Sequence, residues 1–167
     1  PTGDMLPLKI NSVINTSLSL VKDQSMFHGI EIKTTLAQDL PEAIGDRARL
    51  EEVFLNLFIN AADAMKGKGT LTITTGLSRN NSVTITVSDT GEGINKEHLP
   101  HIFEPFFTTK EPGRGTGLGL SIVYGIIRKH NGVIDAESEP GKGTTFIILL
   151  PLYMGKYDGM DEDVFYS

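Results

Sequence analysis

The chain has no cysteine among its 167 residues, which excludes disulfide bonds and thiolate metal sites and is consistent with a reducing compartment. Long apolar runs are also missing: no stretch approaches the ~18 residues that a membrane span needs, and no secretory signal is visible. Positive charge is scarce, with 15 Lys and Arg against 21 Asp and Glu. Because the basic residues are also scattered, nucleic-acid binding is disfavoured.

The residues that are present predict one α/β domain over residues 1–151. Apolar residues make up 39% of the chain, which is enough for a core. Helical spacing occurs within 8–27, 47–65 and 118–129. Alternation predicts strands at 30–36, 70–77, 82–89, 132–138 and 144–151. This order predicts helices packed on one face of a mixed sheet, an α/β sandwich.

The remaining segments are expected to be irregular. Residues 37–46 read as a loop because Pro41 and Gly45 interrupt any period. Residues 152–167 are acidic and aperiodic, so we expect an acidic tail or linker there. Residues 90–116 also lack a sustained period, and a loop of this length in a compact domain is usually a lid or a binding loop.

A glycine-rich stretch, GRGTGLGL (113–120), leads from this loop into a helix that begins near Gly117. It matches neither G-x-G-x-x-G nor the P-loop pattern. Gly115, Gly117 and Gly119 can adopt backbone angles closed to other residues. The first N–H groups of the helix are unpaired and attract anions. The stretch is therefore a phosphate site or a flexible surface loop.

The central helix carries two amides one turn apart, Asn56 and Asn60, on the same face as Glu52 and Asp63. Amide oxygens are hard ligands that suit Mg²⁺, which also holds phosphate oxygens. The alternative is that both Asn side chains satisfy backbone groups. Taken alone, the helix favours this structural interpretation.

Asp89 continues the every-second-residue pattern of the apolar residues in the strand 83–87, so its side chain should lie on the same buried face, at the end of the strand. A buried carboxylate needs a hydrogen-bond donor, and the exocyclic amine of adenine is a suitable one. Gly91 and Gly93 keep the following backbone thin enough for a flat base to approach. The alternative is an Asp that caps its own turn.

The segment FEPFFTTK (103–110) places three phenylalanines and then a cation in the irregular loop. Aromatic residues there suggest a hinge that packs when a lid closes. Lys110 and Arg114 supply positive charge suited to outer phosphates. The alternative is a small hydrophobic cluster beside solvated cations.

Together these segments resemble the ATP-binding catalytic domain of two-component sensor histidine kinases, which belongs to a superfamily with gyrase B, Hsp90 and MutL. The resemblance covers about 6–151. Its motifs are LNLFINAADAM (55–65) as the N box, DTGEG (89–93) and GRGTGLGL (113–120) as the glycine boxes, FEPFF (103–107) as the F box, and GKGTTF (141–146) as the last turn and strand. Each motif alone would be weak, but their shared order is specific. The resemblance implies a Bergerat ATP-binding fold with a mobile lid over about 94–116.

The resemblance also implies a binding site for ATP and Mg²⁺. Asn60 would hold the metal, Asp89 the adenine amine, and Thr144 the base through its hydroxyl. Catalytic roles would fall to Asn56, which faces the phosphates, and to Lys110 and Arg114. The other implied nucleotide contacts lie on the central helix, the glycine boxes and the lid: Asp63, Gly91, Gly93, Ile94, Thr109, Lys110, Gly115, Thr116, Gly117, Leu118 and Gly119.

The implied function is donation of the γ-phosphate of ATP to a histidine on a separate dimerisation domain, which would precede Pro1. A response regulator would act downstream. We expect the domain itself to be monomeric and cytoplasmic, without contact to nucleic acid or membrane, although the parent kinase could be membrane-bound. His28, His98, His101 and His130 should have ordinary surface or capping roles.

Two positions depart from the superfamily's patterns. The ATP hydrolases carry Glu where Asn56 stands, and an amide cannot activate water as a base, so transfer is favoured over hydrolysis. Asp63 stands where some histidine kinases carry a basic residue, which puts phosphate contacts from this helix in doubt. The alternatives are a superfamily ATPase, an ATP-sensing scaffold without phosphotransfer, and a Ser/Thr kinase of the anti-sigma-factor type.

Overall fold

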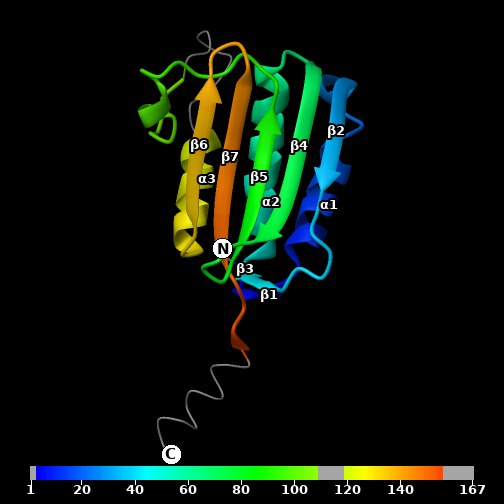
Figure 1. The fold of residues 1–167 in the computed structure, drawn as a ribbon, viewed down its shortest axis with the longest axis vertical. Helices are drawn as coiled ribbons and strands as arrows, with labels where there is room; N and C mark the ends of the chain where they lie inside the picture. The colour runs from blue at the N-terminus through cyan, green and yellow to red at the C-terminus, as the bar shows by residue number, and fades with distance from the viewer. Residues whose placement is uncertain (1–2, 109–118, 156–167) are drawn as a thin grey trace, which may run out of the picture.

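The computed structural model describes residues 3–108 and 119–155, which form a five-stranded sheet with helices on a single face (Figure 1) and a second sheet of two short strands. The five strands run in the order β2-β4-β5-β7-β6, and β2 and β4 are parallel while the other pairs are antiparallel. The elements are β1 (Leu6–Leu8), α1 (Ile10–Val21), η1 (Ser25–Phe27), β2 (Gly29–Thr35), β3 (Ala43–Gly45), α2 (Arg47–Ala64), β4 (Lys68–Leu77), β5 (Ser82–Asp89), η2 (Leu99–His101), α3 (Gly119–Lys129), β6 (Val133–Glu139) and β7 (Gly143–Pro151). The predicted mixed sheet and α/β sandwich are therefore confirmed.

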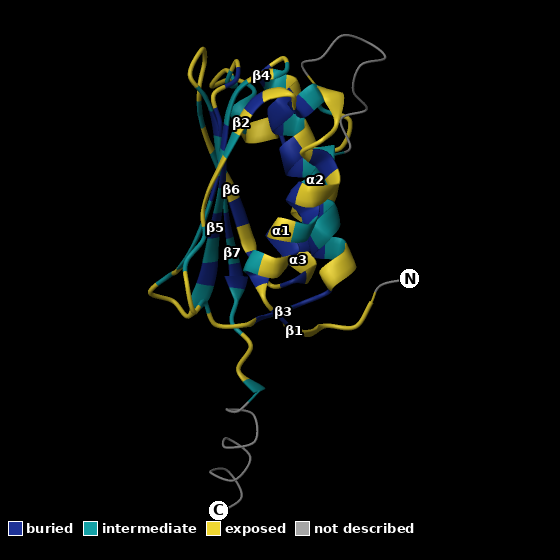
Figure 2. Ribbon diagram, turned by 90° about the vertical axis from the view of Figure 1, so that its right-hand side faces the viewer, coloured by how far each residue is buried: buried dark blue, intermediate teal, exposed yellow. Residues whose placement is uncertain are grey.

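The core lies between the sheet and the helices α1, α2 and α3, which Figure 2 shows on one side of the sheet. Strict alternation in β5 and β7 turns every second side chain toward the helices, where it is buried. The buried stripe of α2 has helical spacing and includes Leu50, Leu57 and Phe58. Burial of these apolar faces orients the sheet and the helices relative to each other.

No described helix covers the outer face of the sheet (Figure 2). Serine and threonine hydroxyl groups pair across its strands. Ser88 and Thr145 are cross-strand partners on β5 and β7, and their hydroxyl oxygens are 2.7 Å apart. Thr74 and Thr86 form a similar pair across β4 and β5. These half-exposed pairs stabilise the sheet on the side away from the core.

The segment 37–46, expected to be a loop, contains the short strand β3. It pairs antiparallel with β1, with Leu6 opposite Gly45. Leu152 forms a bridge with Ala43, and the Tyr153 N–H donates to the Glu42 carbonyl at 2.8 Å. Three-residue strands are too short for an alternating pattern, which is why the sequence did not reveal them. The start of the predicted tail is thus held to β3, while 156–167 lie outside the described residues.

His130 caps a helix, as expected, but it is not a surface residue, because only 3% of it is exposed. Its Nε2 accepts the Asp46 N–H at 3.0 Å, so Nδ1 carries the ring proton and donates to the Ile126 carbonyl at 2.8 Å. The ring therefore does cap α3, but it also joins the end of α3 to the start of α2. His28 and His101 are exposed, as expected.

Candidate functional site

Asp89 ends β5 on its buried face, as its parity predicts, and is 6% exposed. Its Oδ1 accepts the backbone N–H groups of Gly91 at 2.8 Å and Thr144 at 3.3 Å. The first bond shows that Asp89 caps its own turn. A carboxylate has about four acceptor positions, so two backbone bonds leave capacity for a ligand amine.

Burial raises the pKa of Asp89 above its ordinary value, although the hydrogen bonds from Gly91 and Thr144 act in the opposite direction. Removing a carboxylate from water disfavours its charged form more than two amide donors favour it. The fold therefore retains an acidic group where the ionised form costs stability. Perturbed carboxylates of this kind cluster at functional sites.

Thr144 lies directly opposite Asp89 in the register of β5 and β7 and is also buried. The two residues predicted to hold the base thus come from strands 55 residues apart in sequence and become neighbours through the sheet. The Thr144 hydroxyl oxygen is 2.8 Å from the hydroxyl oxygen of Ser138, on β6. Ser138 is not among the residues predicted from the sequence, although it alternates in step with Ile134 and Ala136, which indicates the inner face.

The loop after Asp89 packs against protein backbone on two sides. A Cβ on Gly91 would lie 2.7 Å from the carbonyl of Ala64, and a Cβ on Gly93 would lie 2.2 Å from that of Glu139. Gly93 also has a φ of +73°, which disfavours other residues. The loop's own packing therefore requires glycine at both positions, and their contact with a base stays a prediction.

The same loop places Asp89 at the C-terminal end of α2. The Glu92 N–H donates to the Ala64 carbonyl at 3.1 Å, and Ala64 lies one turn beyond Asn60. Asn56 and Asn60 are both half-buried. Gly119 starts the described part of α3, and a Cβ on it would lie 3.6 Å from Asn56 Oδ1. The structure thus brings the amide face of α2 to the end of the molecule that carries Asp89.

Other residues on α2 have different surroundings. Asp63 is exposed. Glu52 pairs with Arg49 at 3.4 Å on the surface of the helix. This pair holds the Glu52 carboxylate within its own helix, one turn before Asn56. The correspondence of Asn56 to the base of the superfamily's hydrolases stays a prediction from the resemblance.

The first part of the predicted lid is packed on the core. The Ile94 N–H donates to Ser138 Oγ at 2.8 Å, and Ile102 is buried. The Phe103 ring stacks on Tyr124 at a centroid distance of 5.4 Å and meets the edge of Phe146 at 6.2 Å. Phe103 thus belongs to a hydrophobic cluster.

Two further phenylalanines of the same segment are less buried. Phe107 packs against His98 and His101, while Phe106 is 74% exposed. The rest of the predicted lid and glycine box lies outside the described residues, which leaves these contacts as predictions: Thr109, Lys110, Arg114, Gly115, Thr116, Gly117 and Leu118.

The donor set near Asp89 fits magnesium bound together with phosphate. Within residues 3–108 and 119–155, no three His, Cys, Asp or Glu side chains are placed to hold a metal ion. Mg²⁺ in nucleotide sites is commonly held by one or two protein oxygens and by substrate phosphates. The amide oxygen of the half-buried Asn60 is a suitable protein oxygen.

A separate pocket of about 500 Å³ lies at the opposite end of the molecule. Leu6, Lys9 and Arg47 are among the residues that line it, where β1 meets the first turns of α1 and α2. None of the predicted site residues lines this pocket.

Among the described helices, none has the length and apolar character required to cross a bilayer.

The chain is similar to a protein family and to curated relatives. Residues 45–154 match the family model described as histidine kinase-, DNA gyrase B-, and HSP90-like ATPase. The sensor histidine kinase ZraS of Escherichia coli is 40% identical over 149 residues, which are 89% of this chain and 31% of ZraS. The chain therefore spans about a third of the length of this curated relative.

Solved structures show the same fold. The catalytic domain of histidine kinase ThkA superposes with a TM-score of 0.79 at 31% identity, over 90% of this chain and 97% of that one. Full-length ShkA in complex with AMPPNP also has a TM-score of 0.79, at 28% identity, over 89% of this chain and 31% of ShkA. The chain is thus similar to catalytic domains of histidine kinases across nearly its whole length.

Proposed function

Because the chain belongs to the family of histidine kinase-, DNA gyrase B- and HSP90-like ATPases, we propose that it binds ATP with Mg²⁺ and donates the γ-phosphate to a histidine of a separate acceptor domain. This donation would be a step of two-component signal transduction, with a response regulator as the later partner. Support for the donor role comes from the similarity to sensor histidine kinases. Support for nucleotide binding comes from the buried carboxylate of Asp89 at the end of β5.

The observation that carries the proposal is the buried carboxylate of Asp89 beside the hydroxyl of Thr144. The amino group at C6 of adenine would donate to the acceptor positions that Gly91 and Thr144 leave on the carboxylate. A buried acceptor rejects a base that presents a keto oxygen, because two acceptors would then oppose each other. Asp89 would thus select adenine.

The phosphates would extend from the base toward α2 and the start of α3. Asn60 would hold Mg²⁺, which supplies charge neutralisation on the phosphate oxygens when bound. Asn56 would orient the phosphates by donating from its Nδ2, because its side-chain amide lies beside the backbone at Gly119. An amide cannot remove a proton from water, so this arrangement favours transfer to a protein nucleophile over hydrolysis.

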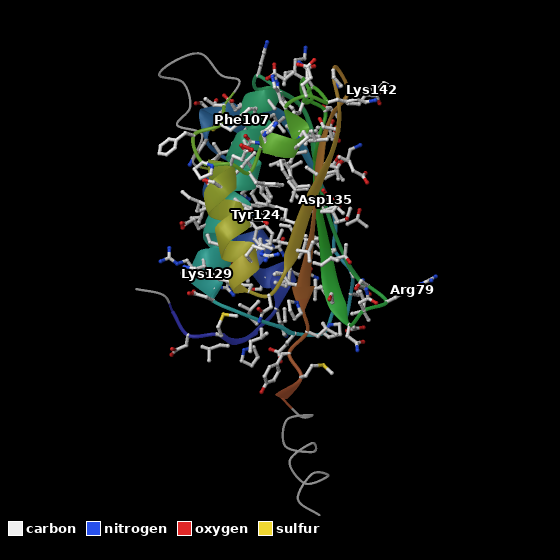
Figure 3. All side chains as sticks on the ribbon, turned by 90° about the vertical axis from the view of Figure 1, so that its left-hand side faces the viewer. Arg79, Phe107, Tyr124, Lys129, Asp135 and Lys142 are labelled. Carbon is white, nitrogen blue, oxygen red and sulfur yellow. The ribbon has the colours of Figure 1, made fainter. Side chains whose placement is uncertain are left out.

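The acceptor domain would dock beside α3. Tyr124 and Ile122 on this helix and Phe106 before it are large apolar side chains that remain exposed. Figure 3 shows Tyr124 on α3 below Phe107, on the helix side of the sheet. Exposed large apolar side chains beside a proposed catalytic site are typical of a protein contact surface.

Titration with ATP and Mg²⁺ tests nucleotide binding, with folding monitored by circular dichroism. Asp89→Asn places amide N–H donors against the adenine amine, so we expect about 10- to 100-fold weaker binding. Asn60→Ala should weaken binding only when Mg²⁺ is present. Unchanged affinity in both folded variants would refute the proposed site.

Transfer of labelled phosphate from ATP tests the reaction. The chain should phosphorylate the histidine-bearing dimerisation domain of its parent kinase when the two are mixed, and the product should be acid-labile. ATP binding without transfer to this acceptor would favour an ATP-sensing scaffold. Steady hydrolysis by the chain alone would favour a superfamily ATPase.

A further inference from the structure

Ser138 lies near the end of β6, with its side chain on the inner face and half-buried. Three polar groups surround its hydroxyl oxygen: the Ile94 N–H at 2.8 Å, the Gly143 carbonyl at 2.9 Å and the Thr144 hydroxyl at 2.8 Å. They come from the loop after β5, from the start of β7 and from the side chain beside Asp89.

The donors in this group can be assigned by counting protons. A serine hydroxyl has one proton and two lone pairs. The Gly143 carbonyl can only accept, so it takes the Ser138 proton. The Ile94 N–H can only donate, so it occupies one lone pair of Ser138. The Thr144 hydroxyl must then donate its own proton to the second lone pair.

This assignment determines whether the proposed base site offers hydrogen-bond donors or acceptors. With its proton directed at Ser138, Thr144 has only lone pairs left for a ligand, as Asp89 has. We propose that Ser138 is a positioning residue that holds the Thr144 hydroxyl as an acceptor and so strengthens selection of a purine with an amino group over one with a keto group. The inference rests on the proposed function, because it concerns the same nucleotide.

The same hydroxyl also holds the start of the predicted lid. The Gly141 N–H donates to the Glu92 carbonyl at 2.7 Å, next to the bond between Ile94 and Ser138. These two bonds tie the loop after β5 to the end of β6 and to the turn that follows β6. Loss of the Ser138 hydroxyl should therefore release the Ile94 amide as well as the Thr144 hydroxyl.

Ser88 supplies a matched control on the outer face of the same sheet. Its hydroxyl lies 2.7 Å from that of Thr145, and Ser88 and Thr145 are the chain neighbours of Asp89 and Thr144. Both serines are half-buried strand residues paired with a threonine of β7. Ser88→Ala should thus remove a serine–threonine hydroxyl bond to β7 without changing the inner face.

The test compares the affinity for ATP with that for inosine triphosphate, in which a keto oxygen replaces the amino group. In Ser138→Ala the Thr144 hydroxyl can rotate and donate, so the preference for ATP should fall about 3- to 10-fold relative to the unchanged chain. Ser88→Ala should keep the preference, and Ser138→Thr should restore it. An equal preference in Ser138→Ala and Ser88→Ala would overturn the inference.

A double-mutant cycle separates action through Thr144 from general loosening. Thr144→Val removes the hydroxyl that Ser138 orients, so adding Ser138→Ala should then cause no further loss of preference. Independent, additive losses would overturn the inference. Hydrogen exchange without nucleotide adds a second measurement: the Ile94 amide should exchange faster in Ser138→Ala but not in Ser88→Ala, and equal exchange would overturn the network.

The outcomes distinguish this inference from the proposed function. A chain that fails to bind ATP would overturn both. A chain that binds ATP and shows the same ATP preference after Ser138→Ala would overturn only the role of Ser138. A fall in preference that Ser138→Thr restores would support the role of Ser138 and the adenine site together.

Discussion

The two ends of the molecule each bury a titratable side chain, and they use it in opposite ways. At the site end, Asp89 accepts two backbone N–H groups on one oxygen and retains acceptor capacity, while burial raises its pKa. At the opposite end, His130 satisfies both ring nitrogens with backbone groups. The His130 ring therefore stabilises the fold. Burial of the ionised Asp89 carboxylate instead destabilises the fold, and a hydrogen bond from a ligand amine would offset this loss.

The largest expected effect is that of His130→Ala. Removal of the ring leaves the Asp46 N–H and the Ile126 carbonyl without their partner and opens a cavity between α2 and α3. We expect a loss of about 2–4 kcal/mol in the free energy of unfolding, measured by urea denaturation. Affinity for ATP at low temperature should stay near that of the unchanged chain. If His130→Ala kept its stability but lost ATP binding, His130 would serve the nucleotide site and not the fold.

Gly93→Ala should be next in size and should act at the site end. The positive φ and the contact with the Glu139 carbonyl predict a loss of about 1–3 kcal/mol in stability, together with weaker ATP binding, because the loop after Asp89 must move. Gly125→Ala on α3 is the control, since a Cβ there meets nothing within 4 Å and Ala favours a helix. Equal thermal melting of the two variants would contradict the packing of this loop.

Asp89→Asn should change stability by less than about 1 kcal/mol while it weakens ATP binding. The Asn Oδ1 can still accept the N–H groups of Gly91 and Thr144, and the buried charge is removed. Chemical denaturation and calorimetric titration of the same sample measure both quantities. A large loss of stability would show that the Asp89 carboxylate supports the fold, as the His130 ring does.

The smallest expected effect is the contribution of Asp89 to the pH dependence of the unfolding free energy. The folded-state pKa of Asp89 is raised above its unfolded value, so the folded chain binds this proton more tightly than the unfolded chain does. The contribution of Asp89 is therefore present below the unfolded pKa and is lost as pH rises through the folded pKa. The difference in unfolding free energy between the unchanged chain and Asp89→Asn should shrink on acidification, and a difference independent of pH would refute the raised pKa.

Repeating patterns explain which parts of the fold were predictable. The alternation in β5 placed Asp89 on the buried face, because side chains in a strand alternate without exception unless a bulge intervenes. The helical spacing of α2 placed Asn56 and Asn60 on one face in the same way. The strands β1 and β3 were missed because three residues give no period.

Contacts between distant segments explain what was not predictable. His130 lies 84 residues from Asp46, and nothing in the Lys-His-Asn-Gly stretch around it indicates that the end of α3 meets the start of α2. The glycines of DTGEG were assigned to base contact, whereas the backbone of Ala64 and Glu139 already requires them. Ser138 has an inward parity, but only the register and the loop after β5 place three polar groups around its hydroxyl.

The sequence by itself determined the elements with a period, the burial of Asp89 and the amide face of α2, because local backbone geometry dictates where each side chain points. Tertiary structure alone decided which groups meet: Asp89 with the Thr144 amide, Ser138 with Ile94, and His130 with Asp46. Such pairings depend on sheet register and helix packing, which are properties of the whole folded chain. A hydrogen bond between distant residues therefore leaves no signature in either local segment.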